Sequence, residues 1–326
     1  MKTFSEKIWQ DNEYNYRASY GFVPNIHAYL HDDDEARDCM LVVPGGGYCM
    51  CVPHEGELPA NVFFEQGMNV FVLTYTTDIT MAVPLKKQPL NDISRSVRFI
   101  RKRSDEYKIA GKKFFICGFS AGAHVCGSLA VHYGDVKDVD PELDMISNRP
   151  DGAILSYPVI TSGEYAHIYS FQTLLGKEPD EKELEYFSLE KHVTSDTPPC
   201  FIWQTATDDL VPVENSYLFA EAMRKAGVPF AHYVFPSGMH GLSAADSQFF
   251  SMWFGGEYAF EQLHLAVDAV KRGEGVDVPP ERVEELKIQF PDEPGGPPEG
   301  EFPFDKSLAQ DVGLWPELAK VWMSRV

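Results

Sequence analysis

A serine lies between two glycines where the chain changes from a β-like pattern to a helical one. The run Gly118-Phe119-Ser120-Ala121-Gly122 follows the apolar residues 114–117 and precedes a helical pattern over 121–132. It matches G-x-S-x-G, in which the turn from strand to helix strains the serine backbone and larger neighbours would collide with adjacent elements. Because the match occurs in this context, it favours a nucleophilic Ser120 over a chance pattern.

A serine hydroxyl is a weak nucleophile that requires a base and a third group to orient the base. With this elbow the chain order is serine, acid, histidine. Asp208 follows the expected strand 201–205, and His240 lies between glycines after the expected strand 231–235. Both loops are at carboxyl ends of strands, where sites on parallel sheets assemble. We therefore predict His240 as the base and Asp208 as its orienting acid.

Two neighbouring residues offer alternatives for these roles. Asp209 is adjacent to Asp208, and only the spacing to Val211-Pro212 favours the latter. Either carboxylate could instead cap the helix expected to begin near residue 213. His124 shares a helix with Ser120, and its position there favours packing over a role as the base.

The glycine run Pro44-Gly45-Gly46-Gly47-Tyr48 follows the first clear strand. Backbone free of side chains lets amide groups approach a developing oxyanion, so we predict donors from Gly46, Gly47 and Ala121. A phosphate-binding loop is a weaker interpretation, because neither a Walker lysine nor G-x-G-x-x-G is present. Tyr48 and His167 are candidates for substrate contact, although a structural role is equally compatible with each.

The elements that must position these residues alternate along the chain. Strands separated by helices, and reading as continuous apolar runs, predict a mostly parallel sheet covered on both faces, which is a three-layer α/β/α architecture. The expected strands are 39–43, 70–75, 114–117, 152–157, 201–205 and 231–235, and the expected helices are 55–66, 87–107, 121–132 and 213–226.

The length of 326 residues indicates one catalytic domain. Two segments, which we call excursions, depart from the regular alternation of strands and helices. Residues 159–199 are placed where a cap or lid is usual. Residues 247–306 form an insertion with an expected amphipathic helix at 257–272, followed by an extended run to a closing helix at 312–325. This insertion is too long for an ordinary loop, so we predict an arm over the site or an interface between copies of the chain.

The composition limits which binding partners and which cellular compartment we expect. Asp and Glu outnumber Lys and Arg by 49 to 28, a formal charge of −21, which disfavours nucleic acid and anionic membranes. The N-terminus lacks a secretion signal and no stretch of about 18 apolar residues occurs, so we predict a cytoplasmic protein. The six cysteines then read as reduced, mostly buried thiols. Cys49-x-Cys51 lacks the second ligand pair that zinc would need.

With these residues placed, the chain resembles the acetyl-esterase/lipase branch of the α/β hydrolases, near its acetylxylan-esterase-like and feruloyl-esterase-like members. The resemblance covers about residues 38–245 and the final helix. It is carried by Val43-Pro44-Gly45-Gly46-Gly47-Tyr48, Gly118-Phe119-Ser120-Ala121-Gly122-Ala123-His124, Tyr157-Pro158-Val159-Ile160, Ser188-Leu189-Glu190-Lys191-His192-Val193, the run from Thr207 to Ser216, and Phe235-Pro236-Ser237-Gly238-Met239-His240-Gly241.

The resemblance implies an α/β-hydrolase fold, with Ser120 as nucleophile, Asp208 as acid and His240 as base. It also implies removal of acetyl or other short acyl groups from carbohydrates such as xylo-oligosaccharides, without a metal or organic cofactor. Pro44 replaces the histidine of many relatives, and they largely lack the 247–306 insertion.

We accordingly predict a serine carboxylic-ester hydrolase. The alternatives are an amidase or formamidase, a peptidase with the same triad, and a catalytically silent binding protein, since a fold alone does not establish function.

Overall fold

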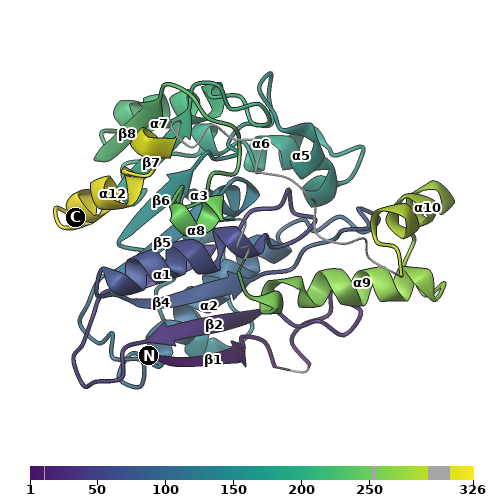
Figure 1. Ribbon diagram of the computed structural model, residues 1–326, viewed down its shortest axis with the longest axis horizontal. Helices are drawn as coiled ribbons and strands as arrows, with labels where there is room; N and C mark the ends of the chain where they lie inside the picture. The colour runs from purple at the N-terminus through teal and green to yellow at the C-terminus, as the bar shows by residue number, and fades with distance from the viewer. Residues whose placement is uncertain (11, 252–254, 293–308) are drawn as a thin grey trace.

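A computed structural model describes residues 1–10, 12–251, 255–292 and 309–326. Its centre is an eight-stranded sheet of order β1-β2-β4-β3-β5-β6-β7-β8 (Figure 1). Strand β2 runs antiparallel to both of its neighbours, and β3 to β8 are mutually parallel. The strands are β1 (Lys2–Lys7), β2 (Asn25–Leu30), β3 (Cys39–Val43), β4 (Asn69–Thr74), β5 (Phe114–Phe119), β6 (Gly152–Ser156), β7 (Cys200–Thr205) and β8 (Phe230–Phe235).

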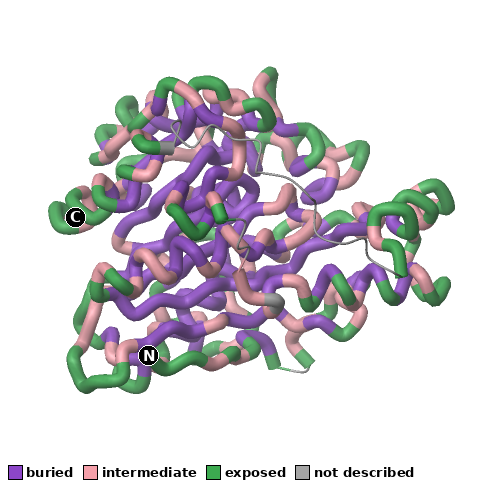
Figure 2. Tube along the Cα trace, viewed as in Figure 1, coloured by how far each residue is buried: buried purple, intermediate pink, exposed green. Residues whose placement is uncertain are grey.

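The predicted α/β-hydrolase fold is confirmed. Every residue of β3 to β7 is buried, as expected for strands covered on both faces, and Figure 2 shows this buried centre. The six predicted strands are all present within two residues at each end. Strands β1 and β2 lie outside the predicted set; β1 has little apolar content and lies at the sheet edge.

Helices form the two outer layers. Apolar side chains of α2 (Gln88–Lys102), α3 (Ala121–His132) and α7 (Glu214–Ala226) share one core cluster. Those of α1 (Glu57–Glu65), α8 (Ser247–Phe250) and α12 (Trp315–Met323) share the cluster on the other face. The remaining short elements on the first half of the chain are η1 (Pro53–Glu55), η2 (Tyr133–Asp135) and α4 (Pro141–Asp144).

The excursion at 159–199 contains α5 (Ile168–Leu175), α6 (Glu181–Tyr186) and η3 (Leu189–Lys191). Its role as a cap stays a prediction. The predicted helix at 257–272 is confirmed as η4 (Glu257–Phe260) and α9 (Glu261–Lys271). The prediction of an extended run after this helix is wrong, because α10 (Pro280–Gln289) follows α9. Proline at the first helical position starts a helix instead of preventing one.

Residues 293–308, which include much of the predicted extended run, lie outside the described residues. Helix α11 (Ala309–Val312) precedes α12. All six cysteines are free, and five are buried, as predicted. In the described ranges, every helix is too short or too polar to cross a membrane.

Candidate active site

Ser120 occupies the turn between β5 and α3. Its backbone has φ 53° and ψ −118°, a strained conformation for a residue with a side chain. A Cβ atom at Gly118 would lie 2.3 Å from the Gly122 carbonyl oxygen. A Cβ atom at Gly122 would lie 2.2 Å from the Val43 carbonyl oxygen. The two glycines are therefore required by close backbone approach, as the pattern predicts.

His240 follows β8 and faces the serine. Its Nε2 lies 2.8 Å from Ser120 Oγ, and its Nδ1 lies 2.9 Å and 3.1 Å from the two oxygens of Asp208. If Nδ1–H donates to Asp208, Nε2 is free to accept the serine proton. The ring also packs edge-on against Tyr157, with centroids 4.8 Å apart. The structure thus brings the three predicted residues into one hydrogen-bonded chain.

The two adjacent aspartates have different contacts. The buried Asp208 side chain also accepts the Leu210 and Val211 amides at 3.0 and 2.9 Å. Burial acts to raise the pKa of Asp208, but the His240 hydrogen bond and charge and these amides outweigh it, so the net shift is downward. Asp209 instead accepts the backbone N–H of His240 at 3.0 Å. Neither side chain caps α7, whose N-cap residue makes no side-chain capping bond.

The glycine loop after β3 lies beside the serine. Gly46 and Gly47 have φ of 121° and 62°, which favour glycine. Within the described ranges, no acceptor pairs with their amides, while the neighbouring Gly45 amide donates to Glu55 at 2.8 Å. Gly46, Gly47 and Ser120 all line one cavity. Gly46 and Gly47 therefore lie beside Ser120, and Ala121 follows it as the first residue of α3; the role of their amides as oxyanion donors stays a prediction.

Sequence reasoning missed Glu55, a buried carboxylate at the end of η1. One of its oxygens accepts the Gly45 amide and the other accepts the Tyr157 hydroxyl at 2.7 Å. Tyr157 in turn accepts the Ser243 amide at 3.1 Å. The only signal in the sequence is a single acid eight residues after the glycine run, which is too weak to single it out.

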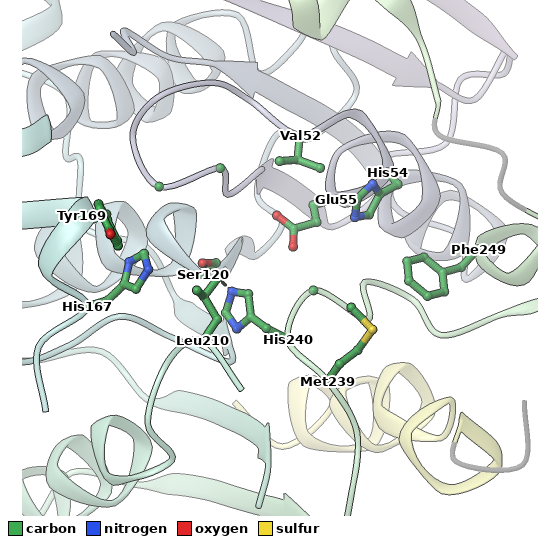
Figure 3. Close-up of a pocket in the computed structure, with 13 residues that line it drawn as sticks. Val52, His54, Glu55, Ser120, His167, Tyr169, Leu210, Met239, His240 and Phe249 are labelled. Carbon is green, nitrogen blue, oxygen red and sulfur yellow. Dashed lines mark hydrogen bonds between the residues drawn. The ribbon is translucent and has the colours of Figure 1, made fainter. Parts of the chain in front are cut away.

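The cavity around Ser120 has a volume of about 470 Å³ (Figure 3). Ser120 and His240 lie near its middle, His54 and Phe249 lie toward one end, and His167 and Tyr169 toward the other. It is lined by Gly46, Gly47, Val52, His54, Glu55, Ser120, His167, Tyr169, Leu210, Met239, His240, Gly241 and Phe249. Phe249 belongs to the 247–306 insertion, so that segment contributes directly to the cavity wall.

The two predicted substrate contacts differ in position. His167 lines the cavity, with Nδ1 2.8 Å from Ser170 Oγ. Burial, assisted by the nearby His240, lowers the pKa of His167. Tyr48 is buried outside the cavity, with 2% of its surface exposed, and its hydroxyl lies 2.6 Å from His124 Nδ1. The structure therefore gives the Tyr48 side chain no access to a substrate.

His124 is in turn anchored on its other side. Its Nε2 lies 2.9 Å from the Phe187 carbonyl oxygen, to which it donates, so Nδ1 accepts from Tyr48. Burial lowers the pKa of His124 to about 4, which keeps the ring neutral. As predicted for a residue on α3, His124 packs instead of acting as the base, and it links the glycine loop to the 159–199 excursion.

The chain is similar to known proteins in sequence and in structure. Residues 27–223 match the BD-FAE family. The chain belongs to this family. A crystal structure of an acetyl ester-xyloside bifunctional hydrolase from Caldicellulosiruptor lactoaceticus is 32% identical, with a TM-score of 0.70 over 84% of this chain and 97% of that chain. A carboxylesterase from Lactobacillus plantarum, 23% identical over 85% and 99% of the two chains, shares the fold with a TM-score of 0.63.

Two relatives are much longer than this BD-FAE chain. Endo-1,4-beta-xylanase B of Butyrivibrio fibrisolvens is 67% identical over 83% of this chain and 42% of its own length. Acetylxylan esterase of Xylanibacter ruminicola is 33% identical over 69% of this chain and 44% of its own length. The chain therefore spans less than half the length of either relative. Together, the family, fold and relatives make the BD-FAE domain an α/β hydrolase related to acetylxylan esterases.

Proposed function

We propose that this protein removes acetyl groups from acetylated xylo-oligosaccharides, through an acyl-enzyme on Ser120. The observation that carries this proposal is the hydrogen-bonded chain from Ser120 through His240 to Asp208, at the middle of an open cavity. A nucleophile, a base and an orienting acid in this order are what acyl transfer requires.

The reaction would proceed in two halves. Ser120 Oγ attacks the acetyl carbonyl carbon while His240 Nε2 takes the hydroxyl proton, and the Gly46, Gly47 and Ala121 amides stabilise the oxyanion. The imidazolium, held by Asp208, then gives its proton to the departing sugar oxygen. Water, deprotonated by the same imidazole, attacks the acetyl-enzyme and releases acetate.

The relatives support the carbohydrate part of the proposal. One is named an acetylxylan esterase and another an acetyl ester-xyloside bifunctional hydrolase. The xylanase relative suggests glycoside cleavage as a second possibility. Glycosidases of the usual type place two carboxylates on opposite sides of the scissile bond. Among the residues that line the described cavity, Glu55 alone carries a carboxylate, and both of its oxygens are engaged. An ester is therefore the better-supported substrate.

The test is hydrolysis of p-nitrophenyl acyl esters from acetate to octanoate and of acetylated xylo-oligosaccharides, by the wild type and by Ser120→Ala. We expect fast acetate release that falls at least about 10³-fold in the variant. Fluorophosphonate labelling should be lost with it. Turnover unchanged in Ser120→Ala would refute the mechanism. Cleavage of amides or acyl peptides in preference to esters would favour the amidase or peptidase alternatives, and no labelling of the wild type would favour a silent binding protein.

A further inference from the structure

A second cavity adjoins the catalytic one. Its volume is about 230 Å³, and it lies between α5, α10 and the loop after β4. We call it the distal crevice, lined by Thr80, Tyr169, Gln172, Lys177, Glu281 and Arg282 among others. Tyr169 lines both cavities, and 68% of its surface is exposed. Its ring therefore connects the crevice with the space beside Ser120.

The walls of the crevice are fixed to one another. The buried Asp78 carboxylate accepts the Thr80 hydroxyl at 2.6 Å and the Thr80 amide at 2.9 Å, which shapes the loop after β4. Gln262 of α9 accepts the Thr77 amide at 2.9 Å, and Arg282 of α10 donates to the Ile79 carbonyl at 2.7 Å. The insertion is thereby bound to this loop.

The α5 wall is attached to the same loop. The Lys86 amide donates to the Leu174 carbonyl at 2.7 Å, and the Lys86 side chain donates to Leu175 at 2.9 Å. Figure 1 shows α5, α9 and α10 toward the same end of the molecule. A crevice whose three walls are joined in this way is formed before any ligand arrives, which lowers the entropy cost of binding.

The chemistry of the lining selects the class of ligand. Seven of the nine lining residues have polar side chains, yet most of the lining surface is apolar, so the crevice offers apolar surface together with polar groups. Lys177 and Arg282 balance Glu281 and Glu285, so the crevice has no net charge with which to select an anion. An exposed tyrosine face beside amide and carboxylate side chains suits a neutral sugar ring, which has an apolar face and several hydroxyl groups.

We propose that the distal crevice is a subsite for a sugar residue of the same oligosaccharide chain, remote from the ester that Ser120 attacks. This inference rests on the proposed function, since it assumes a carbohydrate ester. It assigns the α9–α10 part of the insertion a role in binding. Contacts remote from the reacting group can raise kcat/KM of long substrates while leaving small esters unaffected.

The experiment compares acetylated xylo-oligosaccharides from two to six sugars. The test variants are Gln172→Ala, Glu281→Ala and the double substitution, because both side chains line the crevice but not the catalytic cavity. Glu284→Ala, on the same helix and outside the crevice, is the matched control. Melting temperatures check that each variant is folded.

We expect wild-type kcat/KM to rise about fivefold from the shortest to the longest substrate, a gain of about 1 kcal/mol. The double variant should lose this gain, the control should keep it, and p-nitrophenyl acetate should be cleaved equally by all. A flat profile in the wild type, or an unchanged profile in the double variant, would overturn the subsite while leaving the esterase assignment intact.

A binding measurement separates the two proposals. Titration calorimetry of Ser120→Ala with unacetylated xylohexaose and xylobiose needs no ester. Tighter binding of the longer sugar that is lost with Gln172→Ala and Glu281→Ala supports the subsite, even if acetylated sugars are not cleaved and the proposed function fails. Equal affinity for both sugars, or affinity unchanged by the two substitutions, overturns it.

Discussion

The Tyr157 hydroxyl donates a 2.7 Å hydrogen bond to Glu55, whose other oxygen accepts the amide of Gly45. Tyr157 also packs against the ring of His240. A single buried carboxylate therefore connects the glycine loop on one side of Ser120 with the support of the base on the other. Supporting contacts of this kind hold catalytic groups in productive geometry.

We predict that Glu55→Gln lowers kcat on p-nitrophenyl acetate by between about 10-fold and 100-fold, with a smaller change in KM. The Gly45 amide and the Tyr157 hydroxyl donate to different oxygens of Glu55, and glutamine replaces one of these oxygens with an NH2 group that cannot accept. Steady-state kinetics measure the changes in kcat and in KM separately. Tyr157→Phe is the comparison variant: it removes the bond to Glu55 and the acceptor of the Ser243 amide, but it leaves the Gly45 amide paired with Glu55, so its kcat should fall less. Wild-type kcat in Glu55→Gln would show that the carboxylate does not position the site.

The sequence predicts most of the fold because the parallel strands are buried runs with clear boundaries. The strand at Cys39–Val43 and the helix at Ala121–His132 have the predicted bounds. The strand at Lys2–Lys7 escaped prediction because it pairs on one side only and carries charged side chains. The helix at Pro280–Gln289 escaped because its packing depends on Leu286, which is buried against a helix that a local pattern does not reveal.

In the candidate site, too, some residues can be predicted from the local sequence and others cannot. Ser120, His240 and the glycine loop are recognisable because chemistry and backbone geometry constrain their neighbours in the chain. Glu55, Tyr169 and Phe249 reach the cavity through tertiary packing, which leaves no local pattern. Tyr48 is next to the glycine loop in sequence, yet its side chain turns inward to His124, a direction that adjacency alone cannot predict.

We predict different consequences for the two adjacent aspartates. Asp208→Asn should lower kcat about 10³-fold, because the amide cannot hold the tautomer in which Nε2 accepts the serine proton. Asp209→Asn keeps an oxygen acceptor for the His240 backbone amide and should cost less than about 10-fold. Parallel kinetics on p-nitrophenyl acetate measure both. Equal losses in the two variants would contradict the distinct roles that their contacts indicate.

Tyr48→Phe should reduce kcat about three- to tenfold without a matching change in KM. The substitution removes the 2.6 Å bond to His124, which costs about 1 kcal/mol and loosens the loop that carries Gly46 and Gly47. Because the Tyr48 side chain lies outside the cavity, substrate affinity should be retained. A large rise in KM with unchanged kcat would instead indicate that the tyrosine contacts the substrate.

The free energy of unfolding should depend on pH through the buried Asp92, and it should fall as the pH rises. Burial raises the pKa of Asp92 to about 6, although hydrogen bonds from Thr76, Gln88 and Trp9 act to lower it. In the unfolded chain the value is about 3.9, so the folded state holds a proton between these limits that the unfolded state lacks. The contribution of Asp92 is therefore fully present below about pH 4 and is lost as the pH rises through 6, about 3 kcal/mol in all.

Urea unfolding of the wild type and of Asp92→Asn at several pH values from 5 to 8 tests this sign. The variant loses an acceptor oxygen and should be less stable at pH 5, because Trp9, Gln88 and Thr76 all donate to this carboxylate. The difference in free energy of unfolding between the wild type and Asp92→Asn should shrink by about 1 kcal/mol toward pH 8, because the wild type must then bury a charged carboxylate. Asp105→Asn, which changes an exposed carboxylate, should run parallel to the wild type. Parallel curves for Asp92→Asn would mean that Asp92 is ionised throughout, with its three donors compensating for burial.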